Sequence, residues 1–179
     1  MKPWDFEKFS PLLDEVNPKT ICEIGTHKGN TAVQMIMFLA PKVESLHYTG
    51  YDVFDFASGN LDFNRREYNG KGGVPIKVAQ TKMENLKKIH SNFDYRLYKG
   101  FTKTLLDKAS FDFVYIDGGH SYDTVKFDYE QVKDSKLIVF DDAKNKNAKG
   151  VLTFMDSETY EQVELSSDIL GNKRPFLQD

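Results

Sequence analysis

Four side chains with the potential for chemistry follow two apolar segments in the second half of the sequence. Asp117 and His120 follow the first segment, and Asp141 and Asp142 follow the second. Carboxylates held close together repel one another unless a proton or a cation balances them, and an all-oxygen cluster suits a hard cation such as Mg²⁺. We therefore predict that Asp117, Asp141 and Asp142 hold a divalent cation. The alternative is that Asp117 or Asp141 caps a helix, a position that favours Asp.

His120 is the candidate general base of this group. It follows Asp117 across two glycines, so its imidazole could face the same pocket. Histidine has an ordinary pKa of about 6.5, which lets the neutral ring accept a proton at cellular pH. A histidine at a helix start could instead be a hydrogen-bonding residue of that helix terminus.

A glycine-bracketed turn and one acid are the candidate binding residues of the first half. Gly25 and Gly29 enclose a turn between a predicted strand and a predicted helix, where backbone N–H groups could cradle a carboxylate or a phosphate. Asp52 closes the next predicted strand and could accept hydrogen bonds from two ribose hydroxyls. The alternatives are a purely structural tight turn and a solvated Asp at a strand end.

These residues fall at strand ends in a chain whose predicted strands and helices alternate. Continuous apolar strands that alternate with helices predict an α/β fold, with a Rossmann-like, mostly parallel sheet and helices on both faces. Ligands of such sheets bind outside the carboxyl ends of the strands. A C-terminal antiparallel strand pair is expected at 160–165 and 173–177, around the turn signal Gly171-Asn172. The other predicted strands are 20–24, 46–53, 95–98, 111–116 and 136–140, and the predicted helices are 30–40, 81–90, 102–108 and 121–132.

Length and composition predict one soluble domain. The 179 residues suit a single domain over 1–179, in which the glycine- and aromatic-rich segment 54–73 is an inserted lid. A net charge of −3 gives no general attraction to nucleic acid. The longest apolar stretch, 35–40, is too short to cross a membrane, and no signal peptide is recognisable. The single cysteine, Cys22, fits a reducing, cytoplasmic compartment.

Taken together, the motifs resemble those of class I S-adenosylmethionine-dependent methyltransferases. The chain is most similar to the small-molecule O-methyltransferase branch that includes enzymes of the macrocin and mycinamicin type, and the resemblance covers about residues 20–143. It rests on the turn Glu23-Ile24-Gly25-Thr26-His27-Lys28-Gly29, on Asp52, on Tyr115-Ile116-Asp117-Gly118-Gly119-His120-Ser121-Tyr122 and on Phe140-Asp141-Asp142.

The resemblance implies roles for individual residues. In this family the glycine turn holds the methionine part of the cofactor, and the acid after the second strand holds the ribose. The metal-dependent members bind Mg²⁺ through an acid after the fourth strand and an acidic pair after the fifth. An acid that many relatives use near the adenine is missing after the third strand, so packing by Phe101 is expected there. The implied catalytic residues are His120 and Asp117, and the implied metal ligands are Asp117, Asp141 and Asp142. The residues implied for cofactor binding are Glu23, Gly25, Thr26, Gly29, Asn30, Thr31, Asp52, Val53, Gly100, Phe101, Asp117 and Gly118.

The predicted reaction is metal-assisted methylation of a hydroxylated small molecule, such as a sugar, a diol or a catechol. No nucleic acid or membrane partner is expected, and a homo-oligomer is left open. One alternative is an NAD(P)-dependent oxidoreductase, but the turn lacks the three-glycine G-x-G-x-x-G pattern and that function leaves the three acids unexplained. Another is a non-catalytic S-adenosylmethionine-binding module, which turnover of labelled cofactor would distinguish.

Overall fold

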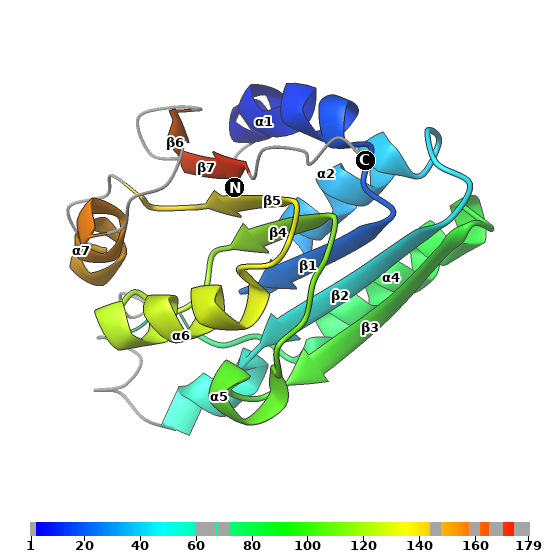
Figure 1. Ribbon diagram of the computed structural model, residues 1–179. Helices are drawn as coiled ribbons and strands as arrows, with labels where there is room; N and C mark the ends of the chain where they lie inside the picture. The colour runs from blue at the N-terminus through cyan, green and yellow to red at the C-terminus, as the bar shows by residue number, and fades with distance from the viewer. Residues whose placement is uncertain are drawn as a thin grey trace.

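The computed structural model describes residues 3–59, 67, 72–143, 148–157, 162–164 and 170–173. Its centre is a sheet of five parallel strands in the order β3-β2-β1-β4-β5 (Figure 1). These strands are β1 (Thr20–Ile24), β2 (Leu46–Asp52), β3 (Phe93–Lys99), β4 (Phe113–Ile116) and β5 (Leu137–Phe140). Beyond β5, β7 (Leu170–Lys173) and then β6 (Gln162–Glu164) extend the sheet in antiparallel pairing.

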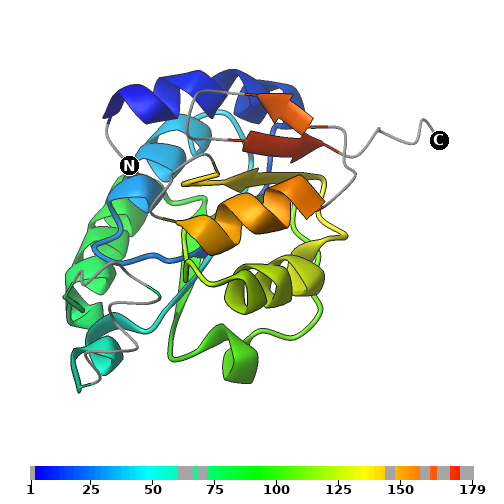
Figure 2. The same ribbon diagram turned by 90° about the vertical axis from the view of Figure 1, so that its left-hand side faces the viewer.

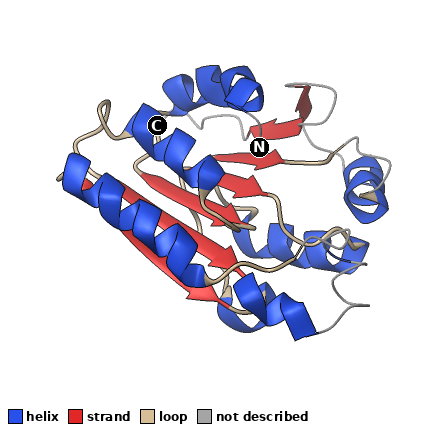
Figure 3. Ribbon diagram, turned by 180° about the vertical axis from the view of Figure 1, so that it is seen from behind, coloured by secondary structure: helices blue, strands red, loops and turns tan. Residues whose placement is uncertain are grey.

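Helices cover both faces of this sheet (Figures 2 and 3). One face carries α1 (Pro3–Val16), α2 (Asn30–Leu39) and α4 (Ile76–Ile89), and the other carries α5 (Thr102–Leu105), α6 (Tyr122–Val132) and α7 (Lys149–Ser157). The short 3-10 helix η1 (Phe54–Gly59) follows β2 directly. Each of the five parallel strands is therefore followed along the chain by a helix, which is the arrangement that places ligand sites at the carboxyl edge.

The apolar strands supply two hydrophobic cores at once. In β4, Phe113 and Tyr115 join the core under α1, α2 and α4, whereas Val114 and Ile116 join the core under α6 and α7. Because side chains alternate between the faces of a strand, a strand covered on both sides must be apolar throughout. This requirement explains why β4 and β5, which are completely buried, consist of apolar and aromatic residues throughout. Rigid central strands in turn fix the positions of the loops that follow them.

The predicted α/β fold with a parallel sheet is confirmed, and element boundaries account for most differences. The helix predicted at 81–90 begins earlier, at Ile76, directly after Pro75, which suits a helix start because proline has no N–H to satisfy. Gly171 and Asn172 lie inside β7, so the turn predicted at these two residues is wrong. Most of the predicted lid at 54–73 lies outside the described residues, apart from η1, Glu67, Gly72 and Gly73. None of the described helices is long and apolar enough to cross a membrane.

Candidate active site

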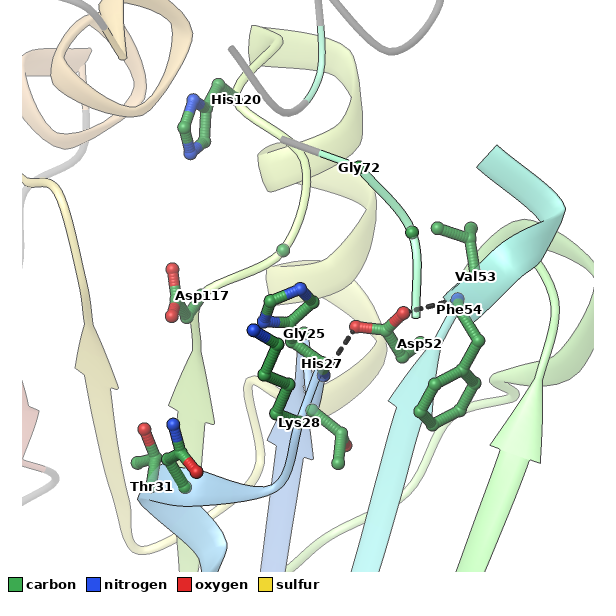
Figure 4. A pocket seen from close by; sticks show the side chains of 14 residues that line it. Gly25, His27, Lys28, Thr31, Asp52, Val53, Phe54, Gly72, Asp117 and His120 are labelled. Carbon is green, nitrogen blue, oxygen red and sulfur yellow. Dashed lines mark hydrogen bonds between the residues drawn. The ribbon is translucent and has the colours of Figure 1, made fainter. Parts of the chain in front are cut away.

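Two adjoining cavities lie at the carboxyl ends of β1, β2 and β4. The smaller cavity, of about 150 Å³, lies at the turn after β1 (Figure 4). The larger cavity, of about 550 Å³, extends along α5 and the start of α6. Gly25, Asp52, Val53 and Gly118 line both cavities, so the two spaces meet at these residues. One elongated ligand could therefore occupy both.

Gly25 fixes how closely the loops after β1 and β4 approach each other. Its φ is 99°, and a Cβ atom there would lie 1.9 Å from the backbone oxygen of Asp117. The Asp117 N–H donates to the carbonyl oxygen of Ile24 at 2.8 Å, and the Gly25 N–H donates to that of Tyr51 at 2.8 Å. Any side chain at Gly25 would separate these loops, so the glycine is required by both conformation and space.

Two backbone N–H groups hold the carboxylate of Asp52 in place. Its Oδ2 atom accepts a hydrogen bond of 2.8 Å from the His27 N–H, and its Oδ1 atom accepts one from the Phe54 N–H (Figure 4). Burial raises the pKa of Asp52, while these two hydrogen bonds act in the opposite direction. A carboxylate oxygen can accept more than one hydrogen bond, so Asp52 can still receive hydroxyl groups of a ligand.

Glu23 lies beneath the turn, and it is not among the described residues that line the two cavities. It is almost fully buried, and its Oε2 atom accepts a hydrogen bond from the Tyr48 hydroxyl, which lies 3.2 Å from Oγ1 of Thr26. Burial raises the pKa of Glu23 to about 8, with the Tyr48 hydrogen bond opposing the shift. Gly50 leaves the room for this network, because a Cβ there would lie 2.5 Å from Oγ1 of Thr26. With this geometry, Glu23 supports the turn from below.

His120 stands on the other side of the smaller cavity, together with Asp117 (Figure 4). The ring is 7% exposed, and its Nε2 atom lies 3.2 Å from Oδ2 of Asp142. The His120 N–H donates to the carbonyl oxygen of Glu67 at 3.0 Å. Ser121, and not His120, is the N-cap of α6, since its side chain accepts from the Thr124 N–H. The imidazole is therefore oriented by a carboxylate, as in general-base pairs.

The three acids predicted to bind a metal lie around one small cavity with His120. Asp142 is engaged by the His120 ring, and the Asp142 N–H donates to Oδ1 of Asp141 at 3.0 Å. Burial and the neighbouring Asp142 carboxylate raise the pKa of Asp141. Within the part of the chain that the structure describes, no group of three or more His, Cys, Asp or Glu residues could hold a metal ion. The predicted acids are thus neighbours, but their arrangement does not fit a metal centre.

Apart from Gly29, which is not among the lining residues, the remaining predicted cofactor residues divide between the two cavities. Gly29, with a φ of 69°, is the N-cap residue of α2, and the smaller cavity is lined by the first residues of that helix. Gly100 donates its N–H to the carbonyl oxygen of Asp52 at 2.9 Å, which joins β3 to the site. The smaller cavity contains Thr26, Asn30 and Thr31, and the larger contains Gly100 and Phe101.

Several lining residues were not assigned by the sequence analysis, among them Lys28, Glu67 and Asp128. Lys28 lies inside the predicted turn and lines the smaller cavity, so its place next to two assigned residues was a usable signal. Glu67 and Asp128 line the larger cavity. Asp128 is an acid on the buried face of α6, a position that normally takes an apolar residue, and this mismatch was visible in the sequence. No comparable signal singles out Glu67.

A comparison with protein families places most of the chain in one of them. A family model described as a methyltransferase domain matches residues 22–156, three quarters of the chain. The chain therefore belongs to the methyltransferase domain family. This match favours a methyltransferase over the nicotinamide-dependent oxidoreductase.

Solved structures share the fold at low sequence identity. An O-methyltransferase of Bacillus cereus in complex with SAH has a TM-score of 0.61 at 16% identity and covers 97% of this chain and 82% of its own. TomG of Streptomyces achromogenes, an O-methyltransferase in complex with SAM, has a TM-score of 0.57 at 15% identity, with coverage of 98% and 81%. The SAH-bound methyltransferase PaMTH1 of Podospora anserina has a TM-score of 0.59 at 10% identity, with coverage of 98% and 80%.

The C-terminal segment also matches a second family. A model described as the elongation factor P OB domain matches residues 147–179. Elongation factor P of Ruegeria sp. strain TM1040 is 70% identical over 30 residues, which are 17% of this chain and 16% of that protein. Elongation factor P of Erythrobacter litoralis is 31% identical over 110 residues, which are 62% of this chain and 41% of that protein. The chain thus spans less than half the length of these curated relatives.

Proposed function

We propose that this protein transfers a methyl group from S-adenosylmethionine to a hydroxyl oxygen of a small molecule. The observation that carries the proposal is the position of Asp52, held by backbone N–H groups where the two cavities meet. An acid in this place suits a ribose, with space on either side for the two remaining parts of a nucleoside cofactor. The SAM and SAH complexes of proteins with the same fold support this ligand class.

The cofactor would lie with its amino-acid part in the smaller cavity. There the turn after β1 and the first residues of α2, Asn30 and Thr31, face the ligand. A helix N-terminus attracts a carboxylate, and the Lys28 side chain adds a positive charge beside it. The ribose would bind Asp52, and the purine would fill the larger cavity. Glu23 would act from beneath by keeping the turn in shape.

The chemistry of the transfer requires positioning and the removal of one proton. The sulfonium carries an activated methyl group, so the acceptor oxygen must lie in line with the bond from sulfur to that methyl. As the new bond from oxygen to carbon forms, the bond from sulfur to carbon breaks, and the hydroxyl proton leaves to a base. His120 is that base in our proposal. Its Nε2 atom lies 3.2 Å from Oδ2 of Asp142, and this carboxylate would stabilise the imidazolium that forms when the ring takes the proton.

The mechanism proposed here does not use the metal ion that was predicted from the sequence. Asp141 and Asp142 destabilise each other's charges, which is a reason for a cation to bind there. Against it stands the observation that no described group of three ligands could hold a metal ion. We therefore route no step through a metal, and chelation tests the point.

The acceptor class remains the one predicted from the sequence, a hydroxylated small molecule such as a sugar, a diol or a catechol. Turnover of S-adenosylmethionine carrying a labelled methyl group, measured across a panel of such compounds, tests the proposal. Label in an ether product that disappears in the His120→Gln variant would support it. Binding of the cofactor with no transfer to any class of oxygen acceptor would instead support a non-catalytic binding module.

A further inference from the structure

Asp128 is a buried carboxylate that the proposed mechanism does not use. It projects from α6 among Val125, Tyr129 and Val132, which belong to the core on that side of the sheet, and it is 1% exposed. Among the described residues, its Oδ1 atom has no hydrogen-bond partner. A buried polar atom without a partner is costly, so a native structure that keeps one needs a reason.

The surroundings of Asp128 place it at the larger cavity. It lines that cavity together with Gly118 and Thr102. A Cβ on Gly118 would lie 3.3 Å from Oδ2 of Asp128, so the glycine lets the loop after β4 rest directly on this carboxyl group. Thr102, at the start of α5, hydrogen-bonds to Asp128. The carboxyl group is thus held between the β4 loop and α5 at the edge of the cavity, and its buried Oδ1 atom receives no hydrogen bond from the described residues.

Near neutral pH, the Asp128 carboxyl group can be either protonated or ionised. Burial raises the pKa of Asp128 to about 7, the Thr102 hydrogen bond and Lys103 act against the shift, and Glu67 adds to it. Both the neutral and the ionised carboxyl groups keep an oxygen that accepts hydrogen bonds. A ligand that offers an N–H group would therefore find an acceptor at either protonation state.

The place of this acceptor along the cleft indicates which ligand group it meets. Resting on the proposed function, the ribose lies at Asp52 and the purine extends into the larger cavity, which reaches from Asp52 to Asp128. The exocyclic amino group is the N–H donor of an adenine ring. We propose that Asp128 accepts a hydrogen bond from the 6-amino group of the purine and thereby selects adenine in the cofactor. It is a specificity-determining residue, and it takes no part in the methyl transfer.

The proposal makes a prediction about discrimination. A site built to hydrogen-bond a ligand N–H loses affinity for an analogue that lacks it, because the buried acceptor is then left without a partner. Wild-type protein should bind S-adenosylhomocysteine roughly tenfold or more tightly than its purine analogue without the 6-amino group. The Asp128→Leu variant, in which no acceptor is left, should bind the two compounds about equally.

Calorimetric titration of both compounds into the wild-type protein and into Asp128→Leu measures the coupling between Asp128 and the 6-amino group. The matched control is Glu130→Leu, which removes an acid of the same helix that pairs with Lys133 and is not among the described residues that line the cavity. This control should keep the wild-type preference. Thermal melting checks that each variant is folded.

The outcomes separate the inference from the function on which it rests. Wild-type protein that binds both compounds equally overturns the role of Asp128, and this comparison needs no variant to fold. A preference that survives in Asp128→Leu overturns it as well. If wild-type protein binds neither S-adenosylmethionine nor S-adenosylhomocysteine, the proposed function itself fails.

Discussion

The two walls of the cleft are held together by different means. On the wall formed by β1 and β2, Asp52 is fixed by two backbone N–H groups, that of Phe54 just after it and that of His27 in the turn after the neighbouring strand β1. On the wall formed by β4 and β5, His120 is fixed by Asp142 and by the carbonyl oxygen of Glu67. The first wall is therefore set by backbone geometry, and the second depends on side chains and on a distant segment.

This difference predicts how substitutions on each wall should act. A change on the β1 and β2 wall should alter cofactor affinity, because that wall presents groups for binding. A change to His120 or Asp142, on the β4 and β5 wall, should alter turnover and leave affinity nearly intact. The predictions below test this division, starting with the largest expected effect.

Substitution of His120 by Gln should have the largest effect. Loss of a general base typically lowers turnover by roughly 10²- to 10⁴-fold, whereas cofactor binding should persist because Asp52 and the turn are untouched. Single-turnover kinetics and calorimetry on the same sample measure the two quantities. The control is His47→Gln, at an exposed residue of β2. A parallel loss of affinity and turnover in H120Q would contradict the division between the walls.

Substitution of Asp52 by Ala should weaken binding of S-adenosylmethionine and S-adenosylhomocysteine. Loss of a charge-assisted hydrogen bond costs about 1.5–3 kcal/mol, which corresponds to roughly ten- to more than a hundredfold in affinity. Asp55→Ala is the matched control, because Asp55 lies in η1 and pairs with Lys99. Calorimetry that finds equal affinities for wild type and D52A would rule out the ribose role.

The buried Glu23 should make stability depend on pH. Its pKa is raised from 4.5 to about 8 in the folded protein, so between these values the folded state holds a proton that the unfolded state has lost. Stability should therefore fall as pH rises from about 4.5 to about 8 and change little above that range. Glu23→Gln should flatten this part of the profile, as thermal melting across the range would show. Glu44→Gln, at an exposed position, should leave the slope unchanged, and an equal slope in E23Q would remove Glu23 as its source.

Chelation should have the smallest effect. Because Asp142 pairs with His120 and no described group of three ligands could hold a metal, we expect methyl transfer to continue in excess EDTA. Labelled-methyl assays with and without added Mg²⁺ measure this. Activity that vanishes on chelation and returns with Mg²⁺ would show that the acids rearrange around a cation and would restore the site predicted from the sequence.

Much of the fold was predictable from the sequence because its strands are buried on both faces. That requirement produces uninterrupted apolar runs, such as those of β4 and β5, which are readable without a structure. Helices α1 and α7 were not predicted. Both pack one face against the rest of the molecule, and α1 carries an internal proline, Pro11, which is normally a signal against a helix.

The candidate site was predictable where spacing along the chain decides the geometry. The Gly25 turn and Asp52 each end a strand, so their meeting follows from the parallel sheet. The orientation of side chains was beyond the sequence. Whether Glu23 faces the ligand or Tyr48 depends on a partner 25 residues away, and the contact of Glu67 with Ser121 spans 54 residues. Contacts of that kind leave no mark on local periodicity.

The overlap of the two family matches has a practical consequence for dividing the chain. Both matches include residues 147–156, which lie mostly in α7. Val151, Phe154 and Met155 of this helix are buried in the same core as Val125 of α6. Removing the chain from the start of the elongation factor P match would therefore remove α7, and the side chains that it covers on one face of the methyltransferase sheet would be exposed. A cut after Ser157, where the helix ends, would keep α7 but would remove β7, the strand that pairs with β5.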